Sequence, residues 1–127
     1  MPSMNELSRA GRDAVNRRRH GQTPLSANVA TEQPTVPVHD LVPQLRSAYR
    51  NGGPDDDPLH DALFIAAGLR AAGVDAALVV GRETAPPSRA ARYLSWVETP
   101  SEGVVTTGAP VEELYEVILR IPHDPSS

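Results

Sequence analysis

One segment, residues 57–73, constrains the fold most, because it carries a helix whose two ends are both marked. Asp57 can cap the helix with its side chain, and Pro58 suits the first helical position, where an amide hydrogen would lack a partner. Gly73 supplies the left-handed residue that ends many helices. Between these ends, apolar residues recur at helical spacing: Leu59, Ala62, Leu63, Ile65, Ala66 and Leu69. The apolar face is broad, so we expect this helix to be well buried.

Four strands are predicted after this helix. Residues 76–81 form a continuous apolar run of strand length, and residues 92–98 alternate with a period of two. Residues 100–103 predict a hairpin turn, with a returning strand at 104–107 and a closing strand at 115–121. Short connections between the later strands require antiparallel pairing. We therefore predict an α+β domain in which one main buried helix packs on a small antiparallel sheet of about four strands.

The N-terminal part of the chain lacks such a pattern. Residues 1–37 contain a three-arginine run at 17–19 and a stretch rich in Ser, Thr and Pro, and they have no sustained apolar periodicity. Such a segment buries too little apolar surface to offset the entropy of ordering it, so we predict a disordered, basic, Pro-rich tail. A short helix over residues 5–18, using Leu7 and Ala14 among others, is the alternative.

Order is expected to begin near residue 38. Asp40 can cap a helix over residues 41–49, and the Gly- and Pro-rich residues 51–54 would stop it. The predicted organisation is thus a tail at 1–37, one domain at 38–122 and a flexible C-terminus at 123–127.

Charge and composition exclude several classes of function. The net charge is −4, and residues 38–127 carry seven arginines against thirteen acidic residues. An acidic domain repels a phosphate backbone, so a nucleic-acid partner is not expected for it. Cysteine is absent, which excludes a thiol nucleophile and a Cys-ligated zinc site. No apolar run approaches the roughly 18 residues of a membrane span, and we expect a cytoplasmic protein without a cofactor or metal.

The order of these elements resembles the transglutaminase-like superfamily, and in particular the leader-peptidase domain of lasso-peptide biosynthesis. That bacterial family reads as a Cys-Leu that opens a helix ending in Gly before a Val/Ile-rich strand. A His-Ala-Trp-Val-Glu strand, a Gly-x-x-Val hairpin and a closing Leu-Leu-x-Val-Pro strand follow. The matching segments of this chain are residues 58–63, 70–76, 79–82, 94–98, 103–105 and 115–122. The resemblance implies a papain-like core.

The positions that carry chemistry in that family differ here. The resemblance places Pro58 at the nucleophile position and Leu94 at the histidine position, and the orienting group falls near Thr106 or Thr107. It thus implies that the start of the helix faces the strand at 94–98, with Leu94 opposite Pro58. None of these side chains can act as thiolate or imidazole, and loss of one member of such a triad already removes most of the rate enhancement. The resemblance therefore implies a pseudoenzyme that binds the precursor peptide or a biosynthetic partner protein of a ribosomally synthesised, modified peptide without cutting it.

Two alternatives remain open. The first is a hydrolase or peptidase with relocated catalytic groups, in which His60 and Asp61 would serve Ser95 as nucleophile. His60 is otherwise a surface histidine beside the capping acids. The second is a small interaction protein that acts through the arginine run at 17–19. The candidate residues for binding a peptide or partner are His60, Asp61, Ser95, Trp96, Arg82 and Arg92, of which Trp96 is otherwise a core residue and the arginines form the best positive patch.

Overall fold

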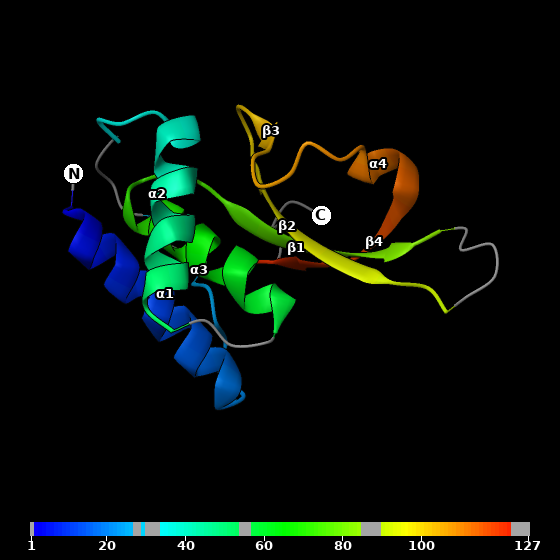
Figure 1. Ribbon diagram of the computed structural model, residues 1–127, viewed down its shortest axis with the longest axis horizontal. Coiled ribbons are helices and arrows are strands. Elements are labelled where there is room, and N and C mark those ends of the chain that lie inside the picture. The colour runs from blue at the N-terminus through cyan, green and yellow to red at the C-terminus, as the bar shows by residue number, and fades with distance from the viewer. Residues whose placement is uncertain (1, 27–28, 30–33, 54–56, 85–89, 123–127) are drawn as a thin grey trace.

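The computed structural model describes residues 2–26, 29, 34–53, 57–84 and 90–122 of the chain. Within these residues the fold is α+β, as the sequence predicts, with the helices gathered at one end and the sheet extending away from them (Figure 1). The elements, in chain order, are α1 (Met4–Arg19), α2 (Val38–Asn51), α3 (Pro58–Ala71), β1 (Ala77–Glu83), β2 (Tyr93–Thr99), β3 (Gly103–Val104), the single turn α4 (Val111–Leu114) and β4 (Tyr115–Ile121).

The four strands form one antiparallel sheet in the order β3-β2-β1-β4. The closing strand has the bounds that its sequence predicts, whereas β3 is shorter than the predicted strand at 104–107. Leu119 pairs with Val80 and Val117 pairs with Gly81, so Ile118 is an extra residue in β4. Such a bulge bends the strand that carries it.

Helix α3 lies at the centre of the helical layer and is the buried helix that the sequence predicts. The Asp57 carboxylate accepts the Leu59 amide at 3.0 Å, and Gly73 has a φ of 97°, so both predicted helix ends are confirmed. Leu63, Ile65 and Leu69 are fully buried. One side of α3 packs on β1 and β2, and α1 and α2 cover the rest of it, so the helix is enclosed on all sides (Figure 1).

Helix α1 corrects the prediction of a disordered tail across residues 1–37. Ser3 accepts the Glu6 amide at the start of the helix, and Leu7, Ala14 and Val15 are at most 5% exposed. The helix packs closely on α3, because a Cβ atom at Gly11 would lie 2.7 Å from the Phe64 ring. The alternative of a short helix was therefore the correct one. The segments at 27–28, 30–33 and 123–127 lie outside the described residues.

Helix α2 begins earlier than predicted, at Val38. Pro37 occupies the cap position without a side-chain hydrogen bond, and Asp40 lies in the first turn instead of capping the helix. Val38 is itself buried, together with Leu41 and Leu45. Tertiary contact with α3 thus stabilises a start for which the sequence holds no capping residue.

The buried Arg70 of α3 binds the segments that follow α1 and α3. Its guanidinium donates to the Ala76 carbonyl at 2.9 Å and to the Ser26 carbonyl at 2.6 Å, and it pairs with Asp75 at 3.3 Å. Ser26 follows Leu25, whose side chain is 4% exposed. The segment after α1 is therefore anchored to α3 as well.

The sheet face that points away from the helices carries a second, smaller apolar cluster. Val79, Trp96 and Val111 form it, and partly buried Leu94 and Tyr115 pack against them. The Trp96 indole donates to Glu98 at 2.9 Å, and Gly81 leaves room for the ring, since a Cβ atom there would lie 2.5 Å from it. Trp96 is 1% exposed, which confirms it as a core residue.

Candidate functional site

The start of α3 meets the middle of β2. Pro58 is the first helical residue, and its carbonyl oxygen accepts the Ser95 hydroxyl at 3.4 Å. Two segments that are 37 positions apart in the chain are thereby joined. The expectation that this helix start lies against the strand at 94–98 is confirmed.

Leu94 does not face Pro58. Successive side chains of a strand point to opposite faces, and Leu94 packs with Trp96 in the cluster on the side away from the helices. Ser95, one residue further, points to the helical side. The expectation that Leu94 faces Pro58 is therefore wrong, and Ser95 is the residue of β2 that contacts the helix start. The position opposite the helix start carries a hydroxyl and still lacks an imidazole.

The two threonines considered for the orienting position both accept hydrogen bonds from main-chain amides. The Thr107 hydroxyl accepts the amide of Ala109 at 3.1 Å in an exposed turn. The Thr106 hydroxyl accepts the amide of Val97 at 3.0 Å and so reaches β2 itself. Of the two, Thr106 is the one that lies beside the strand, and its side-chain oxygen is already used by the main chain.

His60 is buried, with a side chain that is 4% exposed, so the expectation of a surface histidine is wrong. Its Nε2 lies 3.0 Å from the Arg18 guanidinium and 3.6 Å from the Asp57 carboxylate, and Arg18 pairs with Asp57 at 2.7 Å. Arginine can only donate, so Nε2 of His60 is the acceptor in the contact with Arg18. Helix α1, which was predicted to be part of a disordered tail, covers His60 and contributes the Arg18 side chain.

Asp61 points into a different set of contacts. Its carboxylate lies 3.6 Å from the Arg46 guanidinium, which also donates to the Thr106 carbonyl at 2.9 Å. The second carboxylate oxygen of Asp61 is buried without a hydrogen-bond partner. Arg46 therefore links α2, the start of α3 and the chain after β3.

The three side chains of the relocated site, Ser95, His60 and Asp61, each have contacts with other residues. The Ser95 hydroxyl is bound by the Pro58 carbonyl, whereas His60 is held by Arg18 and Asp57 on the side of α1. A general base must lie within hydrogen-bond reach of the proton that it takes, directly or through one water. The contacts described for these side chains join α1, α3 and β2.

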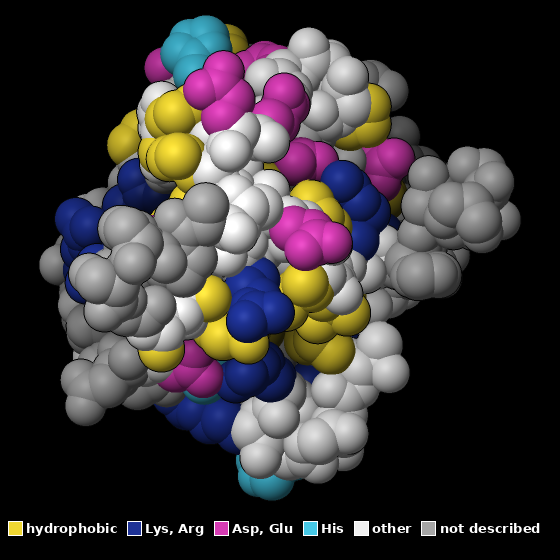
Figure 2. Space-filling model, turned by 90° about the vertical axis from the view of Figure 1, so that its right-hand side faces the viewer, with side chains coloured by type: hydrophobic (Ala, Val, Ile, Leu, Met, Phe, Trp, Pro, Cys, Tyr) yellow, Lys and Arg dark blue, Asp and Glu magenta, His cyan; other side chains and the backbone are white. Residues whose placement is uncertain are grey.

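Arg82 and Arg92 lie at the far end of the β1–β2 hairpin, where the sheet extends beyond the helices (Figure 1). Both side chains are exposed, and the neighbouring Tyr93 is 63% exposed. On the molecular face that Figure 2 shows, basic and hydrophobic side chains adjoin one another near the centre, and most acidic side chains lie in the upper half. Arg89, which lies between Arg82 and Arg92 in the sequence, is outside the described residues.

The outer edge of the sheet is a feature that the sequence analysis missed. β4 is an edge strand, and Val117, Ile118 and Leu119 in it are 48%, 52% and 46% exposed. Single exposed apolar residues are ordinary, but three in a row on a strand edge form a template for pairing. The apolar run was visible in the sequence. Only the strand order shows that nothing among the described residues pairs with its outer side.

No group of three or more histidine, aspartate or glutamate side chains within the described residues could hold a metal ion. None of the described helices combines the length and the apolar character needed to cross a membrane. Comparison of the chain with protein-family models, with curated proteins and with solved structures found no match in any of the three.

Proposed function

We propose that this chain is a cytoplasmic, non-catalytic binding protein related to the leader peptidases of the transglutaminase-like superfamily. In this proposal it binds the precursor peptide or a partner protein of a peptide-modifying pathway and does not cut it. Three features support the proposal: cysteine is absent, proline occupies the helix start where a nucleophile would lie, and the facing strand offers only the Ser95 hydroxyl. A peptide-holding frame without reactive groups favours binding over catalysis.

The observation that carries the proposal is the free edge of β4. An extended peptide can add to such an edge as a further strand, with main-chain hydrogen bonds for affinity and side-chain contacts for specificity. The half-exposed Val117, Ile118 and Leu119 would supply those apolar contacts. The start of β4 lies away from the helices, because the sheet extends beyond them (Figure 1).

Charge favours a basic peptide as the occupant. Glu112, Glu113 and Glu116 are exposed at and just before the start of β4, and residues 38–127 carry six more acidic residues than arginines. Opposite charge steers association and suppresses wrong partners. The proposed ligand is therefore an extended segment with alternating apolar side chains and several lysines or arginines.

The proposal is tested by selecting binders from a displayed library of random extended peptides. We expect enrichment of basic, apolar-alternating sequences, and protection of β4 backbone amides from hydrogen exchange when a selected synthetic peptide is bound. Ile118→Lys should weaken binding about 10-fold or more, because it places a positive charge on the pairing edge.

Tyr93→Lys is the matched control, since it introduces the same charge at an exposed aromatic residue of β2, two strands from this edge. It should leave the affinity within about 2-fold of that of the unmodified protein. Failure to enrich any peptide would refute the proposal, and so would equal losses of affinity in the two variants.

A further inference from the structure

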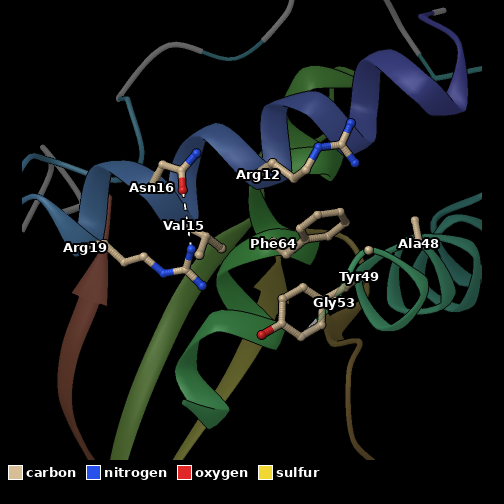
Figure 3. Close-up of a pocket in the computed structure, with 9 residues that line it drawn as sticks. Arg12, Val15, Asn16, Arg19, Ala48, Tyr49, Gly53 and Phe64 are labelled. Atoms are coloured by element: carbon tan, nitrogen blue, oxygen red, sulfur yellow. Dashed lines mark hydrogen bonds between the residues drawn. The ribbon is translucent and has the colours of Figure 1, made fainter. Parts of the chain in front are cut away.

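A cavity between α1, α2 and α3 lies apart from the sheet edge (Figure 3). The side chains that line it differ in chemistry from those of the edge. Its volume is about 120 Å³, which suits a small organic molecule better than a peptide. Helix α1 forms one wall, and the end of α2 with the glycines that follow forms the other. The lining residues are Arg12, Val15, Asn16, Arg19, Ala48, Tyr49, Gly52, Gly53 and Phe64.

The lower part of this cavity is apolar and aromatic. The rings of Tyr49 and Phe64 lie 5.3 Å apart at an angle of 55°, and Val15 and Ala48 flank them. Figure 3 shows the two rings below α1, between that helix and the end of α2. A flat apolar body would find favourable ring and methyl contacts there.

The rim on the α1 side is cationic. Arg12, Asn16 and Arg19 follow one another at spacings of four and three, so they share one side of the helix. Arg19 donates to the Asn16 side-chain oxygen at 3.5 Å, which leaves the Asn16 amide hydrogens available. Arg12 has no hydrogen bond or ion pair with any residue that the structure describes. The described lining contains no acidic side chain.

On the opposite wall, the carbonyl oxygens of Ala48 and Tyr49 are hydrogen-bonded, so they do not offset the positive charge of the arginines. The carbonyl oxygens of Ala48 and Tyr49, at the end of α2, both accept the Gly52 amide at 3.1 and 3.3 Å. Gly53 has a φ of 83°, and a Cβ atom there would meet none of the described residues within 4 Å. The cavity thus combines an apolar base with cationic donors.

We propose that this cavity binds a small molecule with a carboxylate head and a flat apolar body. The carboxylate pairs with the Arg12 guanidinium, whose planar fork matches it in geometry, with Arg19 and the Asn16 amide beside it. The apolar body lies on Tyr49 and Phe64. This site is distinct from the proposed peptide edge, so the two can be tested separately.

The test uses the full chain and three isosteric probes: benzoate, benzyl alcohol and benzylamine. We expect benzoate to bind with a dissociation constant of about 1 mM, near the limit for so few atoms. Chemical-shift changes should be confined to the amides of the lining residues, including Gly52 and Gly53. The alcohol should bind at least about 5-fold more weakly and the amine more weakly still, because only the carboxylate forms charge-assisted hydrogen bonds.

Arg12→Gln should weaken benzoate binding about 10-fold, and Ala48→Leu should abolish it by filling the cavity. Arg17→Gln is the matched control, because Arg17 belongs to the same helix but lines a different hollow, with Ala10, Asp13 and Ala14. It should leave the affinity unchanged. Thermal melts check that every variant is folded.

The proposal is overturned if benzoate binds no tighter than benzyl alcohol, if inorganic phosphate displaces it at equal concentration, or if Arg12→Gln and Arg17→Gln behave alike. Loss of benzoate binding would not affect the selected peptides, and loss of peptide binding would not affect benzoate.

Discussion

The two faces of the sheet are covered in different ways. The face toward the helices is sealed by α3, with α1 and α2 behind it, and contains most of the buried residues. Among the described residues, the other face carries the smaller cluster of Val79, Trp96 and Val111, and β4 at its edge has three half-exposed apolar side chains. The first face specifies the fold, because its apolar area supplies most of the stability. The second face and its edge leave surface available for a partner.

The largest expected effect that tests this comparison is at Phe64, in the middle of the helical layer. Phe64→Ala removes a ring that is 2% exposed and that contacts both Gly11 and Tyr49. We expect the free energy of unfolding to fall by about 3–5 kcal/mol, from lost burial and the cavity left behind. Chemical denaturation measures it, and a loss below about 1 kcal/mol would mean that α1 is not packed on α3.

Arg70→Met should cause the next largest loss in the free energy of unfolding. The substitution keeps the length of the side chain but leaves the Ala76 and Ser26 carbonyls without their donor. Ala76 is fully buried, so leaving its carbonyl unsatisfied should cost about 2–3 kcal/mol in urea unfolding, whereas water can replace the donor at the exposed Ser26. Arg50→Met, at an exposed arginine of α2, is the control and should change stability by less than about 0.5 kcal/mol. Equal effects of the two substitutions would contradict the anchoring role of Arg70.

Gly11→Ala gives a smaller effect whose sign is informative. In an isolated helix the change would stabilise by about 1 kcal/mol, because alanine has the higher helix propensity. Here the new methyl group would meet the Phe64 ring, and overpacking costs about 1–3 kcal/mol. We therefore expect a net loss of melting temperature. Gly108→Ala, where nothing lies within 4 Å, should show no such loss, and a stabilising Gly11→Ala would refute the close α1–α3 contact.

The smallest effect is expected at the exposed edge. Leu119→Thr should change the free energy of unfolding by no more than about 0.5 kcal/mol, because the side chain is already 46% exposed. The same measurement on Leu78→Thr, at a fully buried residue of the neighbouring strand, should show a loss several times larger. Comparable losses at the two positions would mean that the β4 edge is buried by another part of the molecule.

Much of the fold was readable because it depends on local signals. Three local signals predicted their elements directly: the cap at Asp57, the left-handed Gly73 and the strand pattern at 115–121. All three are confirmed. The candidate site was readable only in part. The approach of the helix start to β2 was predicted, but Leu94 was placed on the wrong face, because matching a short motif cannot fix a strand's register to one residue.

The burial of His60 and the packing of α1 could not be read from the sequence with the same certainty. Leu7, Ala14 and Val15 have helical spacing, yet a 16-residue amphipathic helix among many polar residues is marginal by itself. It forms here because the outer side of α3 offers an apolar surface against it. Arg18, in the run expected to be a solvated tail, consequently contacts His60 and Asp57.

The sequence by itself determined which residues form the central helix and the strands, since capping and periodicity act between near neighbours in the chain. Only the tertiary structure decided that α1 closes the helical layer, that Ser95 meets Pro58, and that β4 is left as the open edge. The physical reason is that a pattern shows that a face is apolar, whereas the residues that cover that face come from distant parts of the chain.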